Sequence, residues 1–243
     1  MAKTTPRLFV EQALAAAQEV TLAPEQGHYL GSVLRLGAGD AVEVFNGVDG
    51  AFLAHVAEMT KKKMVLRVER STSAVTPPPD IDYLFAPLKH QRLDYLVQKA
   101  TELGAKRLRP VITARTIAER VNLDRMRANV IEAAEQCNLV FVPEVLDPVT
   151  LNAALREWDS DRALIYCDEV ASKAGPIAAL SRVKLPAAVL VGPEGGFTVE
   201  ERAMLKALPY VTAIGLGPRI MRADTAAVAV LTLVQAVFGD WGR

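Results

Sequence analysis

Residues 190–197 have the sequence Leu-Val-Gly-Pro-Glu-Gly-Gly-Phe, a glycine-rich stretch between an apolar run and a helix-start signal. The apolar run has the composition of a buried strand. Thr198 and, three residues later, Glu201 form the pattern of a capping box, which marks the first turn of a helix. Ligands of α/β proteins bind at the carboxyl ends of strands, where glycines let the backbone approach them closely. The stretch therefore predicts either a ligand-binding loop or an ordinary tight turn. It is neither a dinucleotide fingerprint nor a P-loop.

A second loop of this kind begins about twenty residues further on. Residues 216–226, Leu-Gly-Pro-Arg-Ile-Met-Arg-Ala-Asp-Thr-Ala, also follow a predicted strand and precede a predicted helix. Arg219 and Arg222, with Asp224 close by, concentrate charge at the carboxyl end of that strand. The alternative is that Asp224 caps the helix and that both arginines are solvated. If the two loops lie at neighbouring strand ends, they can enclose one ligand pocket.

Strands alternate with helices around these loops. We predict strands at Ile81–Phe85, Leu108–Ile112, Ala163–Cys167, Ala187–Val191 and Val211–Leu216. We predict helices at Arg92–Leu103, at Leu123–Cys137, from Thr198 onwards and at Thr225–Phe238. Such alternation is typical of parallel strands in an α/β layer. Aromatic side chains can stack on the bases of a nucleic acid, but the spacing of Tyr83, Phe85 and Tyr95 favours core positions in these elements.

The N-terminal part has a different pattern, with short strands and glycine-rich turns. We predict strands at Ala41–Phe45, Ala51–Met59 and Met64–Glu69, the last two joined by a turn that contains Lys61, Lys62 and Lys63, and a helix at Pro24–Leu36. This pattern favours a small barrel or sandwich. Three consecutive prolines, Pro77 to Pro79, then favour an extended linker. We therefore predict a β domain at 1–72, a Pro-rich linker at 73–80 and an α/β domain at 81–243.

The composition limits the partners of the chain. Its 243 residues carry 28 Lys plus Arg and 28 Asp plus Glu, so any nucleic-acid contact must come from a local basic patch. Cys137 and Cys167 form no Cys-x-x-Cys pair and the three histidines are scattered, so we expect no metal site. No apolar run approaches the ~20 residues of a membrane span, and no secretory signal is present. We therefore expect a cytoplasmic protein with reduced thiols and no membrane partner.

The two loops in this order, Gly-Pro-Glu-Gly-Gly-Phe and then Leu-Gly-Pro-Arg-Ile-Met-Arg, resemble the signature of the SPOUT methyltransferases. Three further segments, at 33–36, 98–104 and 135–137, narrow the resemblance to the RsmE-type uridine-N3 methyltransferases of 16S ribosomal RNA. The resemblance covers nearly the whole chain. It implies a PUA-like β-barrel that binds RNA, followed by a SPOUT α/β domain with a C-terminal trefoil knot. It also implies S-adenosylmethionine (SAM) as cofactor, the 16S rRNA of the small ribosomal subunit as substrate, and a homodimer.

Carried over residue by residue, the resemblance implies a set of site residues. The cofactor contacts would come from Leu190, Gly192, Glu194, Gly195, Gly196, Leu216, Gly217, Pro218, Ile220, Met221, Thr225 and Ala226. The catalytic residues would be Arg222, Asp224 and Arg219. Independently of this set, our hypothesis is that basic residues of both domains hold RNA: Arg7, Arg35, Lys99 and Arg115, with Lys89 and Arg92 as further basic candidates. For Lys99 the alternative is an ordinary surface pair with Glu102, one helical turn away.

Methylation of uridine at N3 defines the tasks of these residues. The base must be splayed out, its N3 proton must leave, and positive charge must stabilise the resulting anion. Arg222 or Arg219 suits the last task, because a guanidinium stays charged. Either Asp224 or Glu194 could accept the proton.

The chain departs from the family pattern at two positions. Leu139 stands where an arginine is common, and Asp224 stands where a glutamate is common. The first departure weakens an RNA phosphate contact at position 139, and the second bears on the role of the carboxylate. Two alternatives remain at this point: a SPOUT enzyme that acts on transfer RNA or on a ribose 2′-hydroxyl, and a non-catalytic RNA-binding protein of the same fold.

Overall fold

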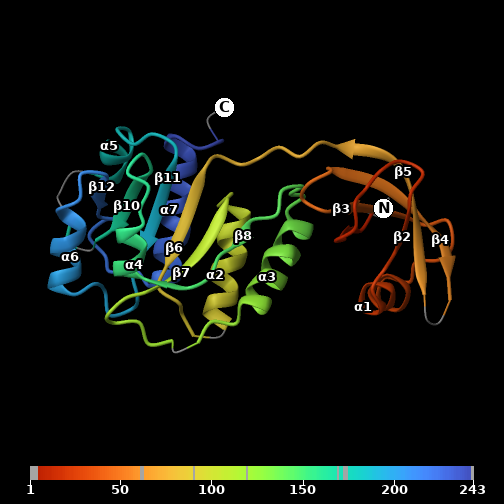
Figure 1. The fold of residues 1–243 in the computed structure, drawn as a ribbon, viewed down its shortest axis with the longest axis horizontal. Coiled ribbons are helices and arrows are strands. Elements are labelled where there is room, and N and C mark those ends of the chain that lie inside the picture. Colours follow the sequence, from red (N-terminus) through yellow and green to blue (C-terminus); the bar gives the residue numbers. More distant parts are fainter. Residues whose placement is uncertain are drawn as a thin grey trace. The chain divides into compact units, whose positions relative to one another are not determined.

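The structure, a computed structural model, describes residues 5–60, 63–89, 91–118, 120–168, 170–171 and 175–241. The chain divides into two compact units (Figure 1). The N-terminal unit comprises Met1–Pro77 and Ala134–Val142, and the C-terminal unit comprises Pro78–Ala133 and Pro143–Arg243. Residues 134–142, which we expected in the second domain, thus group by their contacts with the N-terminal unit.

The N-terminal unit is built on a five-stranded sheet. Its strands are β1 (Arg7–Phe9), β2 (Glu19–Thr21), β3 (Ala41–Phe45), β4 (Ala51–Met59) and β5 (Met64–Ser73), in the order β1-β3-β4-β5-β2. β1 is parallel to β3, and the other pairs are antiparallel. The predicted bounds of β3 and β4 are confirmed, whereas β5 continues beyond Glu69 to Ser73. β1 and β2 have three residues each and were not predicted.

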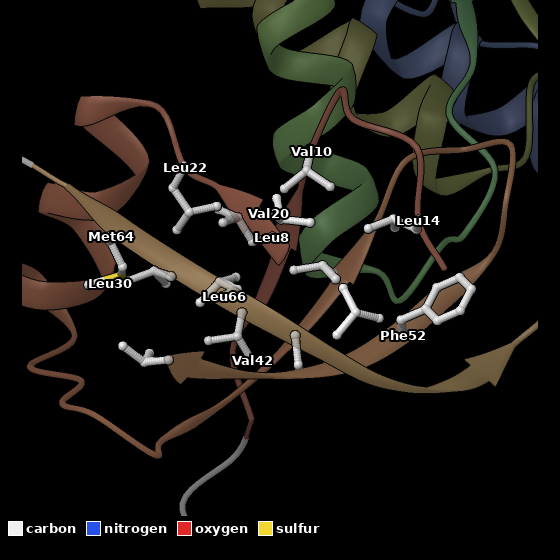
Figure 2. Packing of buried hydrophobic residues seen from close by; sticks show 14 of the residues in the cluster. Leu8, Val10, Leu14, Val20, Leu22, Leu30, Val42, Phe52, Met64 and Leu66 are labelled. Atoms are coloured by element: carbon white, nitrogen blue, oxygen red, sulfur yellow. The ribbon is translucent and has the colours of Figure 1, made fainter. Parts of the chain in front are cut away.

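Alternation along these strands builds the core of the unit. Every second side chain of β3, including Val42 and Val44, is buried, as are Leu66 and Val68 of β5. Figure 2 shows side chains of this cluster, among them Leu66, gathered beside the sheet. The register of β4 against β5 shifts at three places, and such irregularities bend a strand and increase its twist.

The helix predicted at Pro24–Leu36 is shorter and irregular. It consists of α1 (Pro24–His28) and a π-helical turn, η1 (Tyr29–Val33). The helix ends before Arg35, which has a φ of 57° and so lies outside the right-handed helical region. In the predicted turn between β4 and β5, Thr60 N–H donates to the carbonyl of Lys63 at 2.8 Å. Lys61 and Lys62 lie outside the described residues.

The C-terminal unit contains a parallel sheet, as the sequence predicts. Its strands are β6 (Ile81–Phe85), β7 (Arg107–Ile112), β8 (Glu144–Val145), β9 (Val149–Thr150), β10 (Ala163–Cys167), β11 (Ala187–Val191) and β12 (Val211–Ile214). Their order is β12-β10-β11-β6-β7-β8, with β9 paired to β7, and every pairing is parallel. The carboxyl ends of β10, β11 and β12 therefore meet at one edge of the sheet.

Helices cover both faces of this sheet (Figure 1). The helices from Gln91 onwards are α2 (Gln91–Glu102), α3 (Leu123–Gln136), α4 (Leu151–Arg156), α5 (Pro176–Leu180), α6 (Val199–Lys206) and α7 (Ala223–Val237). One face packs Leu84, Tyr166 and Leu190 against Leu151 of α4 and Leu205 of α6. α7 packs against β11 and also contacts α2 and α5. The short helices α4 and α5 and the strands β8 and β9 were not predicted.

Burial on both faces explains why the central strands are continuous apolar runs. Tyr83 and Phe85 are fully buried, as predicted, and their rings stack with centroids 5.1 Å apart. The same prediction was wrong for Tyr95, which is 45% exposed on α2. No helix in the described ranges is long and apolar enough to span a membrane.

Candidate active site

The two glycine-rich loops line a single cavity of about 510 Å³ at the carboxyl ends of β10, β11 and β12. Its volume lies within the range of about 300–1,000 Å³ that is usual for small-molecule sites. The first loop contributes residues 191–197 and the second contributes Leu216 to Ala223 and Ala226. Cys167, Asp168 and Ile214 complete the wall. The sheet thus brings together, in one ligand-sized space, loops that are separated in the sequence.

The first loop needs its glycines for steric reasons. A Cβ atom at Gly192 would lie 2.6 Å from the ring of Phe197, and Gly196 has a φ of 66°. Phe197 cannot move aside easily, because it is buried edge-to-face against Tyr166 with ring centroids 5.1 Å apart. Only a residue without a side chain therefore fits at position 192.

The predicted capping box closes this loop onto α6. Thr198 Oγ1 accepts from the N–H of Glu201 at 3.2 Å, and Glu201 Oε2 accepts from the N–H of Thr198 at 2.9 Å. Glu201 Oε1 also accepts from the N–H of Ala114, which fixes the loop after β7 beside it. In the same place Arg115 donates to the carbonyl of Gly195 at 2.7 Å. The first glycine loop is thus held from both sides.

The second loop presents positive charge to the cavity. Gly217 has a φ of 107°, which an L-residue rarely adopts, and it turns the chain after β12. Arg219 and Arg222 are exposed, line the cavity and have no ion-pair partner among the described residues. The alternative in which Asp224 caps the last helix is wrong, because Arg222 is the N-cap residue and Asp224 lies inside the first turn of α7.

Arg92 connects both loops to α2. Its Nε donates to Asp224 Oδ2 at 2.9 Å, and its Nη1 forms an ion pair with Glu194 Oε1. The hydrogen bond from Arg92 holds the pKa of Asp224 below its ordinary value, although burial acts in the opposite direction. We expected Arg92 to contact RNA instead. The residues around Arg92 in the sequence do not indicate that it bridges the two loops, because its partners are distant in the chain. Glu194 and Asp224 are thus both bound by one guanidinium.

Asp168 also lines the cavity and was not predicted. Its carboxylate is fully buried and lies 2.8 Å from Lys206 Nζ and 3.6 Å from Arg202 Nε. Burial alone would raise the pKa of Asp168. The hydrogen bond from Lys206, the N–H of Val170 and the positive charges of Lys206 and Arg202 outweigh burial, so the pKa lies below its ordinary value. Next to it, burial raises the pKa of the Cys167 thiol to about 12, so this cysteine is not a thiolate at neutral pH.

Three of the predicted cofactor and catalytic residues lie away from the cavity wall. Leu190 is fully buried in the core beneath the first loop. Asp224 faces Arg92, and Thr225 is exposed in the first turn of α7. The other predicted residues of both loops, together with Ala226, line the cavity.

The four predicted RNA-binding residues occupy different environments. Arg115 is at the first glycine loop, and Arg35 is exposed in the N-terminal unit. Lys99 Nζ lies 2.5 Å from Glu102 Oε1, the surface pair that we weighed as its alternative role. Arg7 is 8% exposed and pairs with Glu43 at 2.7 Å.

The guanidinium of Arg7 also binds the backbone of residues 134–142. It donates to the carbonyl oxygens of Ala134 and Leu139, each at 3.1 Å, and lies 4.6 Å from the ring centroid of Phe45. Leu139 itself packs against the small cluster around Phe45. These contacts give Arg7 a structural role, and we leave it out of the RNA surface proposed below.

In the part of the chain that the structure describes, no three His, Cys, Asp or Glu side chains lie close enough together to hold a metal ion.

Family models match most of the chain. The model described as "RNA methyltransferase domain" matches residues 76–235, and the model described as "RNA methyltransferase PUA domain" matches residues 22–69. Among curated proteins, the chain is 31% identical to the ribosomal RNA small subunit methyltransferase E of Bacillus subtilis, over 94% of this chain and 95% of that protein. It is 29% identical to the protein of the same name from Rickettsia conorii, over 94% of each.

Two solved structures resemble the whole chain. One is a methyltransferase of Legionella pneumophila in complex with SAM, with a TM-score of 0.85 and 28% identity over 98% of this chain and 100% of that chain. The other is the ribosomal RNA small subunit methyltransferase E of Neisseria gonorrhoeae bound to SAM. It has the same TM-score and identity, over 98% of this chain and 99% of that chain.

Proposed function

The chain belongs to the RNA methyltransferase family with a PUA domain, and from this premise we propose that it methylates N3 of a uridine in 16S rRNA, with SAM as methyl donor. The observation that carries the proposal is the single cavity formed by the two glycine-rich loops at the carboxyl ends of β11 and β12. The names of the relatives supply the small-subunit rRNA. The same premise supports the cytoplasmic location that the sequence predicts.

The cavity suits SAM in size and chemistry. Its volume of about 510 Å³ exceeds that of a single amino acid side chain, and its wall combines apolar side chains, such as Phe197 and Ile214, with acidic and basic ones. The absence of a side chain at Gly192 leaves room for the ring of Phe197 in the cavity wall. Gly192, Gly195 and Gly196 would hold the cofactor from one side, and Leu216, Gly217 and Met221 from the other. When bound, SAM supplies an electrophilic methyl group on a positively charged sulfur.

The arginines of the second loop would stabilise the reacting base. Loss of the N3 proton leaves negative charge on the uracil ring, and fixed positive charge close by lowers the energy of that state. Arg222 and Arg219 line the cavity, and neither has a described ion-pair partner that would neutralise it. Arg222 is the stronger candidate, because the helix that starts at Ala223 fixes its backbone.

The two carboxylates would have different tasks. Glu194 lines the cavity, so it can reach a base there and accept its proton. Asp224 lies outside the wall, and its lowered pKa makes it a weak proton acceptor. We therefore assign Asp224 a positioning role: it holds Arg92, and Arg92 in turn holds Glu194.

The N-terminal domain would bind RNA outside the active site. We propose residues 1–72 as this RNA-binding domain, 73–80 as the linker and 81–243 as the methyltransferase domain. Arg35 and, in the second domain, Arg115 and Lys99 would contact RNA. The domain match at residues 22–69 supports this division of tasks.

Substitution of Arg35 tests the RNA surface. We expect Arg35→Ala to weaken binding to naked 16S rRNA and to reduce the slope of log K against log salt by about 0.7, the loss of one single-strand phosphate contact. SAM affinity should not change. Arg70→Ala, which removes another exposed arginine of the same unit, is the matched control. Identical salt slopes for both variants would remove Arg35 from the surface.

We further propose that the enzyme is a homodimer. Val199 and Ile220, which are 74% and 92% exposed beside the two glycine loops, support a covering partner there. Sedimentation equilibrium of the purified protein should give twice the chain mass of 26.3 kDa. A monomer at micromolar concentration would contradict this part of the proposal.

The decisive experiment uses small ribosomal subunits from cells that lack this gene. The purified protein and labelled SAM are incubated with these subunits, and any methylated nucleoside is mapped. N3-methyluridine at one position is the expected product. Transfer to transfer RNA or to a ribose hydroxyl instead would move the target but keep the reaction class. Failure to bind SAM in a calorimetric titration would overturn the enzymatic proposal.

A further inference from the structure

A second cavity, of about 740 Å³, lies in the C-terminal unit. Its wall includes Lys89, Leu93, Asp94, Ile117, Arg120 and Arg125. Lys89 lies in the connection between β6 and α2, and the other residues belong to the first turn of α2, the connection after β7 and the first turn of α3. Lys89 was named above as a further candidate for RNA binding. None of the other described wall residues is a predicted site residue.

Positive charge remains unbalanced in this second cavity. Asp94 is bound by Arg125 through two hydrogen bonds, Nε to Oδ1 at 2.8 Å and Nη2 to Oδ2 at 2.6 Å, so these two charges cancel. Lys89 and Arg120 are exposed and have no ion-pair partner within the described ranges. The first turns of α2 and α3 add the partial positive charge of helix N-termini. A ligand of this cavity should therefore carry negative charge.

The wall also offers apolar surface beside the two cations. Ile117 is 58% exposed, and Leu93 and Val121 are half-buried. An isoleucine that is exposed inside a charged cavity offers an apolar surface to a ligand. An anion joined to a flat, weakly polar ring matches this combination, because the phosphate can meet the cations while the ring covers the aliphatic side chains.

The same two chain segments border both cavities. On the first segment, Leu93 lines the second cavity, and its neighbour Arg92 pairs with Glu194 of the first cavity. On the second segment, Arg115 binds the carbonyl of Gly195, and Ile117 lines the second cavity. Two residues of chain span at most about 7 Å. The two cavities are therefore neighbours, and an RNA strand that places one base in the first cavity can also reach the second.

We propose that the second cavity binds the phosphate and base of an RNA nucleotide next to the methylated uridine. The inference rests on the proposed function, which supplies the RNA and the splayed target base. Lys89 and Arg120 hold the phosphate, and Ile117 packs against the base. The subsite thus helps to place the target by holding its neighbour.

The test compares two double variants. Lys89→Ala with Arg120→Ala removes the unbalanced charge of the subsite. Arg127→Ala with Arg156→Ala removes the same charge from exposed positions of the C-terminal unit that line neither cavity. Binding of naked 16S rRNA is measured at several salt concentrations, and SAM binding is measured by calorimetry. A third variant, Ile117→Ala, leaves the charge intact.

The subsite variant should bind RNA roughly tenfold more weakly, with a salt slope lower by about 0.7, equal to the loss of one single-strand phosphate contact. Its SAM affinity should equal that of the wild type and of the control variant. Ile117→Ala should raise the KM for subunits and leave the salt slope unchanged, because it removes no charge.

The outcomes separate this inference from the proposed function. If the wild type methylates subunits but both double variants bind RNA alike, the subsite is wrong and the function stands. If the wild type transfers no methyl group but only the subsite variant loses RNA affinity, the function is wrong and the RNA subsite stands. Displacement of RNA from the wild type by an acidic peptide, with no difference between the double variants, would also overturn the subsite.

Discussion

Both edges of the parallel sheet in the C-terminal unit are rich in charge, but the pairing of these charges differs between the two edges. At the amino ends of the strands, Asp80 and Asp82 are bound by Arg107 and Arg162 at distances of 2.6 to 3.5 Å, and Lys106 adds a further contact to Asp80. At the carboxyl ends, Arg92 holds two carboxylates while the cations of the second glycine loop remain unpaired in the described structure.

The difference separates stability from function. A half-buried ion-pair network in which both carboxylates and both arginines have at least two partners holds the strands together, and removing one member leaves the others less compensated. Unpaired arginines at an exposed rim stabilise the fold little, but they are available to a charged ligand. Substitutions at the amino edge should therefore affect unfolding, and those at the carboxyl edge should affect methyl transfer.

The largest effect is expected from Arg222→Ala. Loss of the positive charge that stabilises the uracil anion should lower kcat by roughly 100- to 1,000-fold, which is about 3 to 4 kcal/mol of activation free energy. The free energy of unfolding should change by less than about 0.5 kcal/mol, because the side chain is exposed. Steady-state methyl transfer to small subunits and urea unfolding measure the two quantities.

Arg219→Ala is the matched control for this prediction. Both arginines line the cavity, so both variants lose the same charge from the same loop. The kcat of Arg219→Ala should fall less than that of Arg222→Ala. A larger loss for Arg219→Ala would exchange the roles of the two residues, and normal kcat for both would remove the second loop from catalysis.

Arg162→Ala should have the next largest effect, at the opposite edge. Its side chain is 12% exposed, and Nη1 lies 3.0 Å from Asp80 Oδ1 and also donates to the carbonyl of Ala187 at 3.1 Å. Its removal should lower the free energy of unfolding by about 2 to 3 kcal/mol, since it breaks a buried network. Urea unfolding measures this loss, and kcat of the folded enzyme should stay within twofold.

Arg127→Ala provides the comparison for Arg162→Ala. Arg127 pairs with Asp124 on the surface of α3, where the side chains are 50% and 94% exposed. Its loss should cost no more than about 0.5 kcal/mol of unfolding free energy. If the two variants unfolded at the same urea concentration, the amino-edge network would not be a stabilising element.

A smaller effect is expected from Arg92→Lys, which sharpens the comparison within the carboxyl edge. A lysine keeps the charge but loses the planar fork that reaches Asp224 and Glu194 together. We expect kcat to fall about tenfold, equivalent to about 1.4 kcal/mol, with SAM affinity unchanged. The acidic limb of the pH–rate profile should also shift, because a positioning residue acts through its carboxylates. If the pH–rate profile did not shift while the free energy of unfolding fell, Arg92 would have only a structural role.

Much of this architecture could be predicted from the sequence because the central strands are buried on both faces. Ala163–Cys167 and Ala187–Val191 are continuous apolar runs, and Ile81–Phe85 is apolar except for Asp82. The bounds of all three strands are confirmed residue for residue. The capping box at Thr198 is confirmed for the same kind of reason, since its hydrogen bonds are local. The glycine loops could be recognised because both lie at predicted strand ends.

The features that were missed depend on contacts between distant residues. β1 has three residues and exists because it pairs with β3, so its own sequence carries little signal. Arg7 and Arg92 were assigned to RNA as basic residues, yet each binds a partner more than 100 residues away in the chain, Leu139 for Arg7 and Asp224 for Arg92. The trefoil knot stays a prediction that rests on the resemblance.

The smallest effect concerns acid sensitivity, which both edges should share. Asp80 at the amino edge and Asp224 at the carboxyl edge both have a pKa below the ordinary value. For Asp80 the contacts of Arg162 and Lys106 outweigh the opposing effect of burial, and for Asp224 the hydrogen bond from Arg92 is the main cause. A lowered pKa in the folded state stabilises the fold above the unfolded pKa of about 3.9, and this contribution is lost as the pH falls through the folded value.

The free energy of unfolding should therefore decrease as the pH falls below about 4, and either Asp80→Asn or Asp224→Asn should make that decrease less steep. Urea unfolding at several acidic pH values measures the slopes. The two variants should differ at neutral pH, where Asp224→Asn lowers methyl transfer because Arg92 loses a partner, while Asp80→Asn leaves the kcat of the folded enzyme unchanged. Acid curves parallel to that of the wild type would show that neither carboxylate is stabilised by its arginine. Equal losses of kcat in both variants would contradict the separation of a stabilising edge from a catalytic one.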